Sequence, residues 1–292
     1  MSVLSYTELS DLNKIAIKAA TEAGQYIQSQ FDGQYVKQRK EGGDSLASQV
    51  VTEVDLKAQE IILKHLKKSI QLHDFGLLTE ESADDRSRLI KDYFWCIDPM
   101  DGTLAFTEHR PGYAVSIALI SKSGDPLVGV VYVPDEVLCY SATKGLGIKL
   151  NDLPFLRKEI QDDETLHVYM DRSFKSEEYF DSVKFRFTQW MEQQNQNIQF
   201  HADFGGVRNA IGVMTSGQGC YFKFPKKRKG CGSIWDYAAT RLFLEELGLH
   251  VSNAQGDRLH LNDPKTTFMN SQGILYATDE KLKEFILELG KG

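Results

Sequence analysis

The sequence has few cysteines, no long apolar run and no excess of basic residues. None of its hydrophobic stretches is long enough to cross a bilayer. Its four cysteines form no C-x-x-C pair and no zinc-type spacing, so we expect free thiols in a reducing compartment. The first five residues contain neither a basic nor an apolar segment, so we expect no secretory signal peptide. These absences predict a cytoplasmic protein with no membrane partner.

The charge balance narrows the function classes further. A formal net charge of −7 over 292 residues argues against a general nucleic-acid-binding protein, whose surface would be basic. It does not exclude an anionic small substrate, because bound cations can reverse the local field. With 41% hydrophobic and 26% charged residues the chain is typical of soluble globular proteins, and its length favours two subdomains over one.

The first half of the chain predicts helices and a largely antiparallel sheet. Apolar residues recur every three or four positions from Thr7 to about Phe31, which predicts an amphipathic helix, and Thr52 is placed to cap a second one. An aromatic strand begins at Tyr93 and should end near Asp98, because Pro99 cannot donate to a sheet. Residues 75–79 form a short apolar run, and further strands are predicted at 112–121, 127–133, 138–143 and 147–150.

The second half alternates strands with helices, which is typical of an α/β layer. Strands are predicted at 166–170, 198–200, 219–224 and 249–252, and helices at 177–194, 207–215 and 234–247. The sequence therefore predicts an N-terminal α+β half, residues 1–151, and a C-terminal α/β half, residues 152–292.

The heptapeptide I-D-P-M-D-G-T, residues 97–103, carries the most chemistry. Asp98 and Asp101 repel each other unless a hard cation neutralises them, and an all-oxygen ligand set suits Mg²⁺. Gly102 lets a ligand approach the backbone closely, and Thr103 is placed to begin a helix whose free N–H groups face an anion. The alternative interpretation is an Asx turn followed by a helix cap.

Three more acidic residues stand in short motifs. Asp55 lies near the start of the second helix, Glu80 belongs to an E-E pair, and Asp236 follows Trp235 at the start of a later helix. Taken singly, each is explained as a helix cap or a solvated carboxylate.

Together and in this order, the motifs T-x-x-D, E-E, D-P-x-D-G-T and W-D-x-A-A resemble the Mg²⁺-dependent, lithium-sensitive phosphatases related to inositol monophosphatase. The resemblance covers nearly the whole chain, from the first helix to the strand before Thr278. It implies a layered α/β/α/β/α sandwich of the inositol monophosphatase and sugar phosphatase type, with the active site between the two halves. It also implies a small phosphorylated metabolite as substrate, and homodimers are common in the family.

The same resemblance implies a role for each motif residue. Two or three Mg²⁺ ions would be held by the side chains of Glu80, Asp98, Asp101 and Asp236 and by the backbone carbonyl of Met100. Thr103 and Asp55 would orient and deprotonate the attacking water, with no covalent phosphoenzyme. Backbone N–H groups of Gly102 and Thr103 would hold phosphate oxygens at the helix start.

The substrate is indicated by the segment before Asp236. Inositol monophosphatases tend to carry a glutamate where this chain has Lys223, and the pattern Y-x-K-x-P looks more like the 3'(2'),5'-bisphosphate nucleotidases. A cation there suits a second phosphate, although Lys223 lies on a strand and can face either way. The basic run 226–229 is also explained as a solvated loop. The leading substrate is therefore a bisphosphate nucleotide such as 3'-phosphoadenosine 5'-phosphate, with inositol 1-phosphate or a similar sugar phosphate as the alternative.

Two departures count against the nucleotidase. Leu104 stands where several nucleotidases carry a lysine, and a substrate-contacting serine is replaced within the segment 204–208. Arg208 in that segment is either a phosphate ligand or a residue on the helix face. A non-catalytic phosphometabolite-binding protein of the same fold is a further alternative, but the chain keeps the metal ligands and the Thr103/Asp55 pair that such a relative should have lost.

Overall fold

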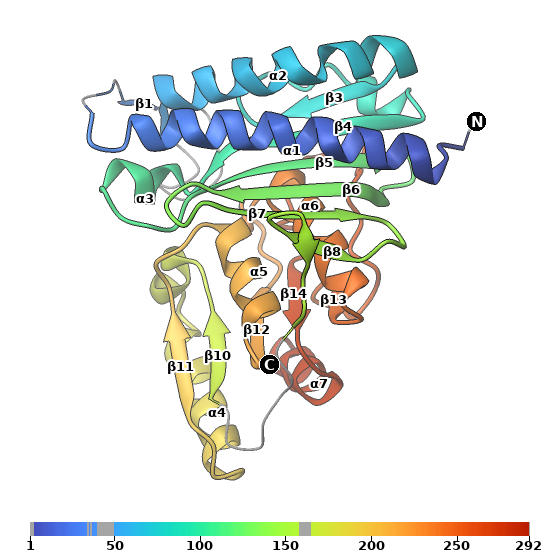
Figure 1. Ribbon diagram of the computed structural model, residues 1–292. Helices are drawn as coiled ribbons and strands as arrows, with labels where there is room; N and C mark the ends of the chain where they lie inside the picture. Colours follow the sequence, from blue (N-terminus) through green and yellow to red (C-terminus); the bar gives the residue numbers. More distant parts are fainter. Residues whose placement is uncertain (1–2, 34, 36, 40–49, 158–164, 292) are drawn as a thin grey trace.

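The computed structural model describes residues 3–33, 35, 37–39, 50–157 and 165–291, and layers of helix and sheet alternate through it (Figure 1). The helices are α1 (Tyr6–Ser29), α2 (Glu53–His73), α3 (Thr103–Thr107), α4 (Phe180–Glu192), α5 (Gly206–Thr215), α6 (Ile234–Glu246) and α7 (Glu280–Leu289). Helices α1 and α2 cover the outer face of the larger sheet, and α5 and α6 lie between the two sheets (Figure 1).

The larger sheet has seven strands, which neighbour one another in chain order. They are β3 (Gly76–Thr79), β4 (Tyr93–Asp101), β5 (Ala114–Ser121), β6 (Pro126–Val133), β7 (Leu138–Thr143), β8 (Ile148–Leu150) and β9 (Leu153–Pro154). Only β3 and β4 pair in parallel, which confirms the prediction of a largely antiparallel sheet. A separate two-stranded ladder joins β1 (Lys37–Arg39) to β2 (Val50–Thr52).

The smaller sheet has five strands in the order β11-β10-β12-β14-β13. They are β10 (Leu166–Tyr169), β11 (Ile198–His201), β12 (Gln218–Lys223), β13 (His250–Ser252) and β14 (Ile274–Ala277). Strands β11, β10 and β12 run parallel, whereas β14 is antiparallel to β12 and β13. Parallel strands end at the same edge, so the polar residues that follow β10 and β12 come close together.

Alternating side chains on the strands produce the layers. On β5, Val115 and Ile117 pack in the core under α1 and α2, whereas Ala118 points to the opposite face and packs with α5 and α6. On β12, Tyr221 faces α5 and α6, and Phe222 packs in the outer core with α4 and α7. Each sheet is thus buried on both faces, which confirms the predicted α/β/α/β/α sandwich.

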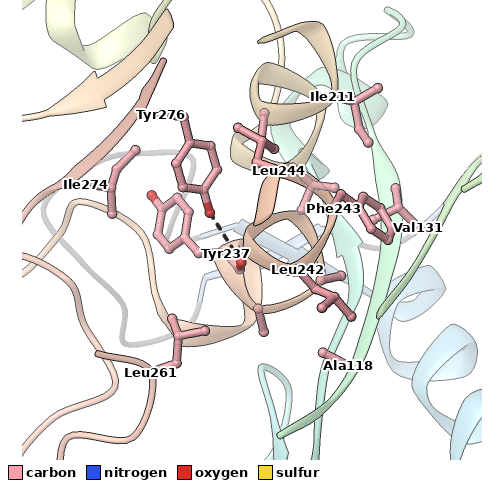
Figure 2. Close-up of a cluster of buried hydrophobic side chains, with 14 of the residues drawn as sticks. Ala118, Val131, Ile211, Tyr237, Leu242, Phe243, Leu244, Leu261, Ile274 and Tyr276 are labelled. Atoms are coloured by element: carbon pink, nitrogen blue, oxygen red, sulfur yellow. Dashed lines mark hydrogen bonds between the residues drawn. The ribbon is translucent and has the colours of Figure 1, made fainter. Parts of the chain in front are cut away.

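Helix α6 is the central element of this sandwich. Figure 2 shows Leu242 and Phe243 of α6 beside Ala118 and Val131 of the larger sheet, all in one buried cluster. On the other side of α6, the hydroxyl of Tyr276, which belongs to the smaller sheet, donates to the backbone carbonyl of Tyr237 in α6 at 3.3 Å (Figure 2). Burial from both sides fixes α6, and with it the residues of its first turn.

Among the predicted boundaries that differ from the structure, one lies in the motif that carries the chemistry. Strand β4 continues to Asp101 instead of ending near Asp98. Its pairing with β5 is irregular between these residues: Asp98 lies opposite Ser116, whereas Asp101 lies opposite Ala114. Pro99 falls in this bulge, where its missing N–H interrupts no ladder bond. The two aspartates therefore belong to a bulged strand, within which the Met100 N–H donates to Asp98 Oδ1 as in an Asx turn.

Two features of the described residues bear on the remaining expectations. No helix among them combines the length and the apolarity needed to cross a membrane. The four cysteines are all free thiols. The division of the chain at residue 151 stays a prediction.

Candidate active site

Acidic residues from the larger sheet and from helix α6 line a cleft of about 380 Å³. Glu80 follows β3 and Asp98 and Asp101 lie at the end of β4, so two neighbouring parallel strands deliver them to the same edge. Asp236 comes from the first turn of α6. Oxygen atoms of the three aspartates lie within 4.8 Å of one another, close enough for one ion to touch all three.

Backbone N–H groups hold each aspartate in place. Met100 N donates to Asp98 Oδ1 at 3.0 Å, and Ser233 N donates to Asp236 Oδ2 at 3.0 Å. The first turn of α5 donates twice to Asp101, from residues 206 and 207 at 3.1 and 2.8 Å. These bonds orient the carboxylates before any ligand binds.

Gly205 provides the space that Asp101 occupies. A Cβ atom at this position would lie 2.3 Å from Asp101 Oδ2, which is far inside van der Waals contact. Only glycine therefore allows α5 to approach the carboxylate closely. From the sequence, this segment was noted only for lacking the serine that is usual in the family, and the close contact between Gly205 and Asp101 was not predicted.

Burial and mutual repulsion make this cluster unstable as a set of free anions. Burial raises the pKa of Asp101 to about 7, and the charge of Glu80 adds to the effect. Burial also raises the pKa values of Asp98 and Asp236 well above their usual range, with further contributions from the neighbouring carboxylates. Such a group either holds protons or binds a cation. Its donors are all oxygen atoms, so the residues present fit Mg²⁺.

Metal-free protein should become less stable as the pH rises from about 4 to about 7. Between these values the folded chain, in which the pKa of Asp101 is about 7, holds more protons than the unfolded chain, where it is 3.8. Calorimetry should therefore find a smaller loss of melting temperature over this range in Asp101→Asn than in the native chain. Added Mg²⁺ should raise the melting temperature more at pH 7.5 than at pH 5.5. Equal pH profiles for the two proteins would contradict the account of this cluster.

Asp55 performs two tasks with its two oxygen atoms. Oδ2 caps α2 by accepting from the Thr52 N–H at 2.8 Å and from the Thr52 hydroxyl at 2.5 Å. Oδ1 accepts from the Thr103 hydroxyl at 2.9 Å. Burial raises the pKa of Asp55 to about 6, against the opposing effect of these hydrogen bonds. The cap predicted from the sequence is therefore present, and it leaves the second oxygen for Thr103.

Met100 and Gly102 complete this side of the cleft. The Met100 carbonyl lies 3.0 Å from Thr103 Oγ1, so it shares that hydroxyl with Asp55. Gly102 has a φ of 85°, and a Cβ there would lie 2.5 Å from a neighbouring carbonyl oxygen. A side chain would be strained at this position, and its absence exposes the backbone that enters α3.

Lys223 faces the cleft, but its charge is already paired. Its ammonium lies 2.5 Å from Asp171 Oδ2 and 5.5 Å from the ring centroids of Tyr221 and Tyr237, and only 11% of the side chain is exposed. The positive charge lowers the pKa of Asp236, although burial and the nearby carboxylates outweigh it. Lys223 therefore acts on the acidic cluster from a fixed position.

The structure does not bring Arg208 to the cleft. Its guanidinium pairs with Glu136 and lies 5.6 Å from the ring centroid of Phe204, which is the helix-face alternative. In the basic run, residues 227–229 are exposed, as expected for a solvated loop. Lys226 instead is half-buried and lines the cleft.

Several cleft residues were not predicted from the sequence. Asp171, which pairs with Lys223, lies two residues after the end of β10 at the carboxyl edge of the parallel strands, and that position was a usable signal. Arg110 and Arg172 line the cleft as well, and their sequence positions gave no such signal. An aromatic wall is formed by Phe174, Tyr179, Phe224 and Phe268.

Comparison with known proteins agrees with this geometry. A sequence model of the inositol monophosphatase family matches residues 8–290. Nus factor SuhB from Pasteurella multocida (strain Pm70) is 30% identical over 263 residues, which cover 87% of this chain and 89% of that protein. The 3'(2'),5'-bisphosphate nucleotidase CysQ from Salmonella typhimurium (strain LT2) is 28% identical over 260 residues, covering 86% and 94%. The solved structure of an IMPase from Thermotoga maritima shares the fold, with a TM-score of 0.72 at 20% identity over 96% and 98% of the two chains.

Proposed function

Because the chain belongs to the inositol monophosphatase family, we propose that it hydrolyses a phosphate monoester of a small metabolite with the help of bound Mg²⁺. The observation that carries the proposal is the gathering of four carboxylates at one end of a cleft. A hydroxyl–carboxylate pair, Thr103 and Asp55, stands next to them. The first group fits a hard cation, and the second fits the transfer of a proton from water.

Two or three Mg²⁺ ions would be held by Glu80, Asp98, Asp101, Asp236 and the carbonyl of Met100. When bound, the ions neutralise phosphate oxygens and lower the pKa of a water molecule. The hydrogen bonds to the aspartates keep the ligand oxygens fixed, so little reorganisation is needed when the ions enter.

Thr103 and Asp55 would orient the attacking water and accept its proton. Because the Thr103 hydroxyl donates to Asp55 Oδ1, its oxygen lone pairs are free to accept a hydrogen bond from water. As the water attacks phosphorus, one of its protons passes to Thr103 Oγ1 and the hydroxyl proton passes to Asp55. A carboxyl with a pKa of about 6 is mostly ionised at neutral pH and still basic enough for this step. The bond between phosphorus and the ester oxygen breaks, and the leaving alkoxide takes a proton from bulk water and departs as the alcohol. N–H groups of Gly102 and Thr103 would hold the phosphate oxygens.

We propose a 3'(2'),5'-bisphosphate nucleotide as the leading substrate. The aromatic wall supports this choice, because its rings could stack on a nucleotide base. The ring centroids of Phe174 and Tyr179 are 5.6 Å apart, and Tyr179 also contacts Phe224. The hydroxyls of inositol would instead need polar partners on this wall. The name of the CysQ relative agrees with a nucleotide, and the name of the matching family keeps inositol 1-phosphate as the alternative.

Phosphate release from 3'-phosphoadenosine 5'-phosphate and from inositol 1-phosphate, measured side by side with Mg²⁺, tests this choice. We expect kcat/KM to favour the nucleotide by more than about tenfold, equivalent to ~1.4 kcal/mol in transition-state binding. A preference for inositol 1-phosphate would replace the nucleotide by the sugar phosphate and leave the phosphatase proposal intact.

A non-catalytic role is the remaining alternative, and the relatives named Nus factor SuhB keep it relevant. Calorimetric titration distinguishes it: Mg²⁺ and phosphate ester would bind, but no phosphate would be released. We also propose that the protein is cytoplasmic and forms a homodimer. Its partner would be a small metabolite and not a nucleic-acid polymer.

A further inference from the structure

Two arginines in the lining of the cleft share one carboxylate. Arg172 donates from both terminal nitrogens to the two carboxylate oxygens of Glu108, each at 2.9 Å. Arg110 donates to Glu108 Oε2 from Nε at 3.0 Å and from a terminal nitrogen at 2.5 Å. Glu108 follows α3, whereas Arg172 begins the short helix η3 (Arg172–Ser176), so the group joins the two halves of the chain beside the cleft. We call these three residues the arginine clasp.

The clasp has donors left for a ligand. A guanidinium carries five N–H groups, and each arginine uses two of them on Glu108. Among the described residues, the other acidic neighbour is Asp203, whose carboxylate is 3.7 Å from Arg110, too far for a hydrogen bond, and whose side chain is 68% exposed. Arg110 is 32% exposed and Arg172 is 47% exposed. Two oriented cations with unused N–H groups thus line the cleft.

Lys223, the cation expected from the sequence, is less suited to hold a second phosphate. It is 11% exposed, and one of its three N–H donors is already directed at Asp171, so little of it can reach a new anion. The arginines of the clasp are more exposed, and Glu108 fixes both guanidinium planes while other N–H groups of each remain unused. Planar forks of this kind bind phosphate oxygens in pairs.

We propose that Arg110 and Arg172, oriented by Glu108, form a subsite for a second phosphate group of the substrate, the one that is not hydrolysed. This inference rests on the proposed function and refines it: the substrate class is a metabolite with two separate phosphates. The location agrees with a nucleotide, because Phe174 of the aromatic wall lies on the same short helix as Arg172. If the base stacks on this wall, the phosphate on its sugar would lie in the same cleft, which Arg172 also lines.

The matched substrates 3'-phosphoadenosine 5'-phosphate and 3'-AMP test the subsite, because they share the reacting phosphate and differ only in the second one. The native enzyme should prefer the bisphosphate. Arg172→Gln should lower kcat/KM for the bisphosphate roughly 10- to 100-fold, mainly through KM, and leave 3'-AMP unchanged. Arg172→Lys should retain part of the preference. Arg258→Gln removes an arginine that is 55% exposed, against 47% for Arg172, and that is paired with Asp125 outside the cleft lining; it should change kcat/KM for neither substrate.

Binding of 5'-AMP in EDTA, measured by calorimetry, separates this subsite from the hydrolysis. Without Mg²⁺ the acidic cluster repels phosphate, so AMP should bind through the clasp and lose roughly 10- to 100-fold in affinity in Arg172→Gln. If neither ester is hydrolysed but this loss is observed, the proposed function fails and the subsite stands. If Arg172→Gln affects 3'-AMP as much as the bisphosphate, or leaves AMP affinity unchanged, the subsite is refuted.

Discussion

Replacing Asp98 by asparagine is expected to lower Mg²⁺-dependent phosphate release by about a thousandfold or more, since a bound metal contributes several kcal/mol and each 1.36 kcal/mol is tenfold. Asp98 is 1% exposed, and its carboxylate has two other aspartates within 4.8 Å. The amide removes the ligand charge while keeping the shape. Steady-state phosphate release at saturating Mg²⁺ measures the loss.

The same substitution should leave the protein folded. Burial and three neighbouring carboxylates raise the pKa of Asp98, so an uncharged amide relieves repulsion in the metal-free state. The melting temperature of metal-free Asp98→Asn should equal or exceed that of the native chain. Asp74→Asn, at an exposed carboxylate paired with Lys91, is the control and should retain activity. Full turnover by Asp98→Asn would remove this residue from the metal site.

Thr103→Val is expected to reduce kcat by roughly 10²- to 10⁴-fold, the usual contribution of general acid–base catalysis. Valine has nearly the same shape but removes the hydroxyl that donates to Asp55. Mg²⁺ affinity should change little, because the side chains proposed to hold the metal are untouched. This separates Thr103→Val from Asp98→Asn, in which metal affinity and turnover fall together.

Thr107→Val provides a matched control for this prediction. Thr107 is also buried and lies on α3, where its hydroxyl donates to the Leu104 carbonyl at 3.0 Å. Thr103→Val should cost about 1–3 kcal/mol of stability, because it removes a hydrogen bond from a buried carboxylate oxygen of Asp55. Thr107→Val should cost less, because the Leu104 carbonyl still accepts from the Glu108 N–H at 3.1 Å. Only Thr103→Val should lose turnover. A similar loss of activity in both variants would indicate distortion of α3 and not a missing proton pathway.

The sequence predicted the layers because each depends on local signals. The near-continuous apolar run of strands such as β5 is typical of a strand buried on both faces, and the helical period predicts α1 and α2. The predicted end of β4 was wrong because a bulge accommodates Pro99 inside the strand. The residue pattern of β4 alone does not show how it pairs with β5, so the bulge could not be predicted. Helix α7 was not predicted at all, although its Asp279 cap and apolar stripe were readable.

The acidic residues proposed for the site could be predicted from the sequence because they stand in compact motifs. Contacts between distant segments left no such signal: Glu108 meets Arg172 across 64 positions, and Lys223 meets Asp171 only after two strands align. The sequence could not decide which way Lys223 faces, because its direction depends on the pairing of β12 with β10. The clasp and the wall therefore emerge only from the fold.

Release of inorganic phosphate by the native protein, titrated with Mg²⁺ after treatment with EDTA, tests the central claim most directly. The substrates are 3'-phosphoadenosine 5'-phosphate and inositol 1-phosphate. The account predicts that at least one ester is hydrolysed, that EDTA abolishes the reaction, and that added Mg²⁺ restores it. Turnover that persists in EDTA, or no turnover of either ester while Mg²⁺ binds, would contradict the claim that these carboxylates form a metal-dependent phosphatase site.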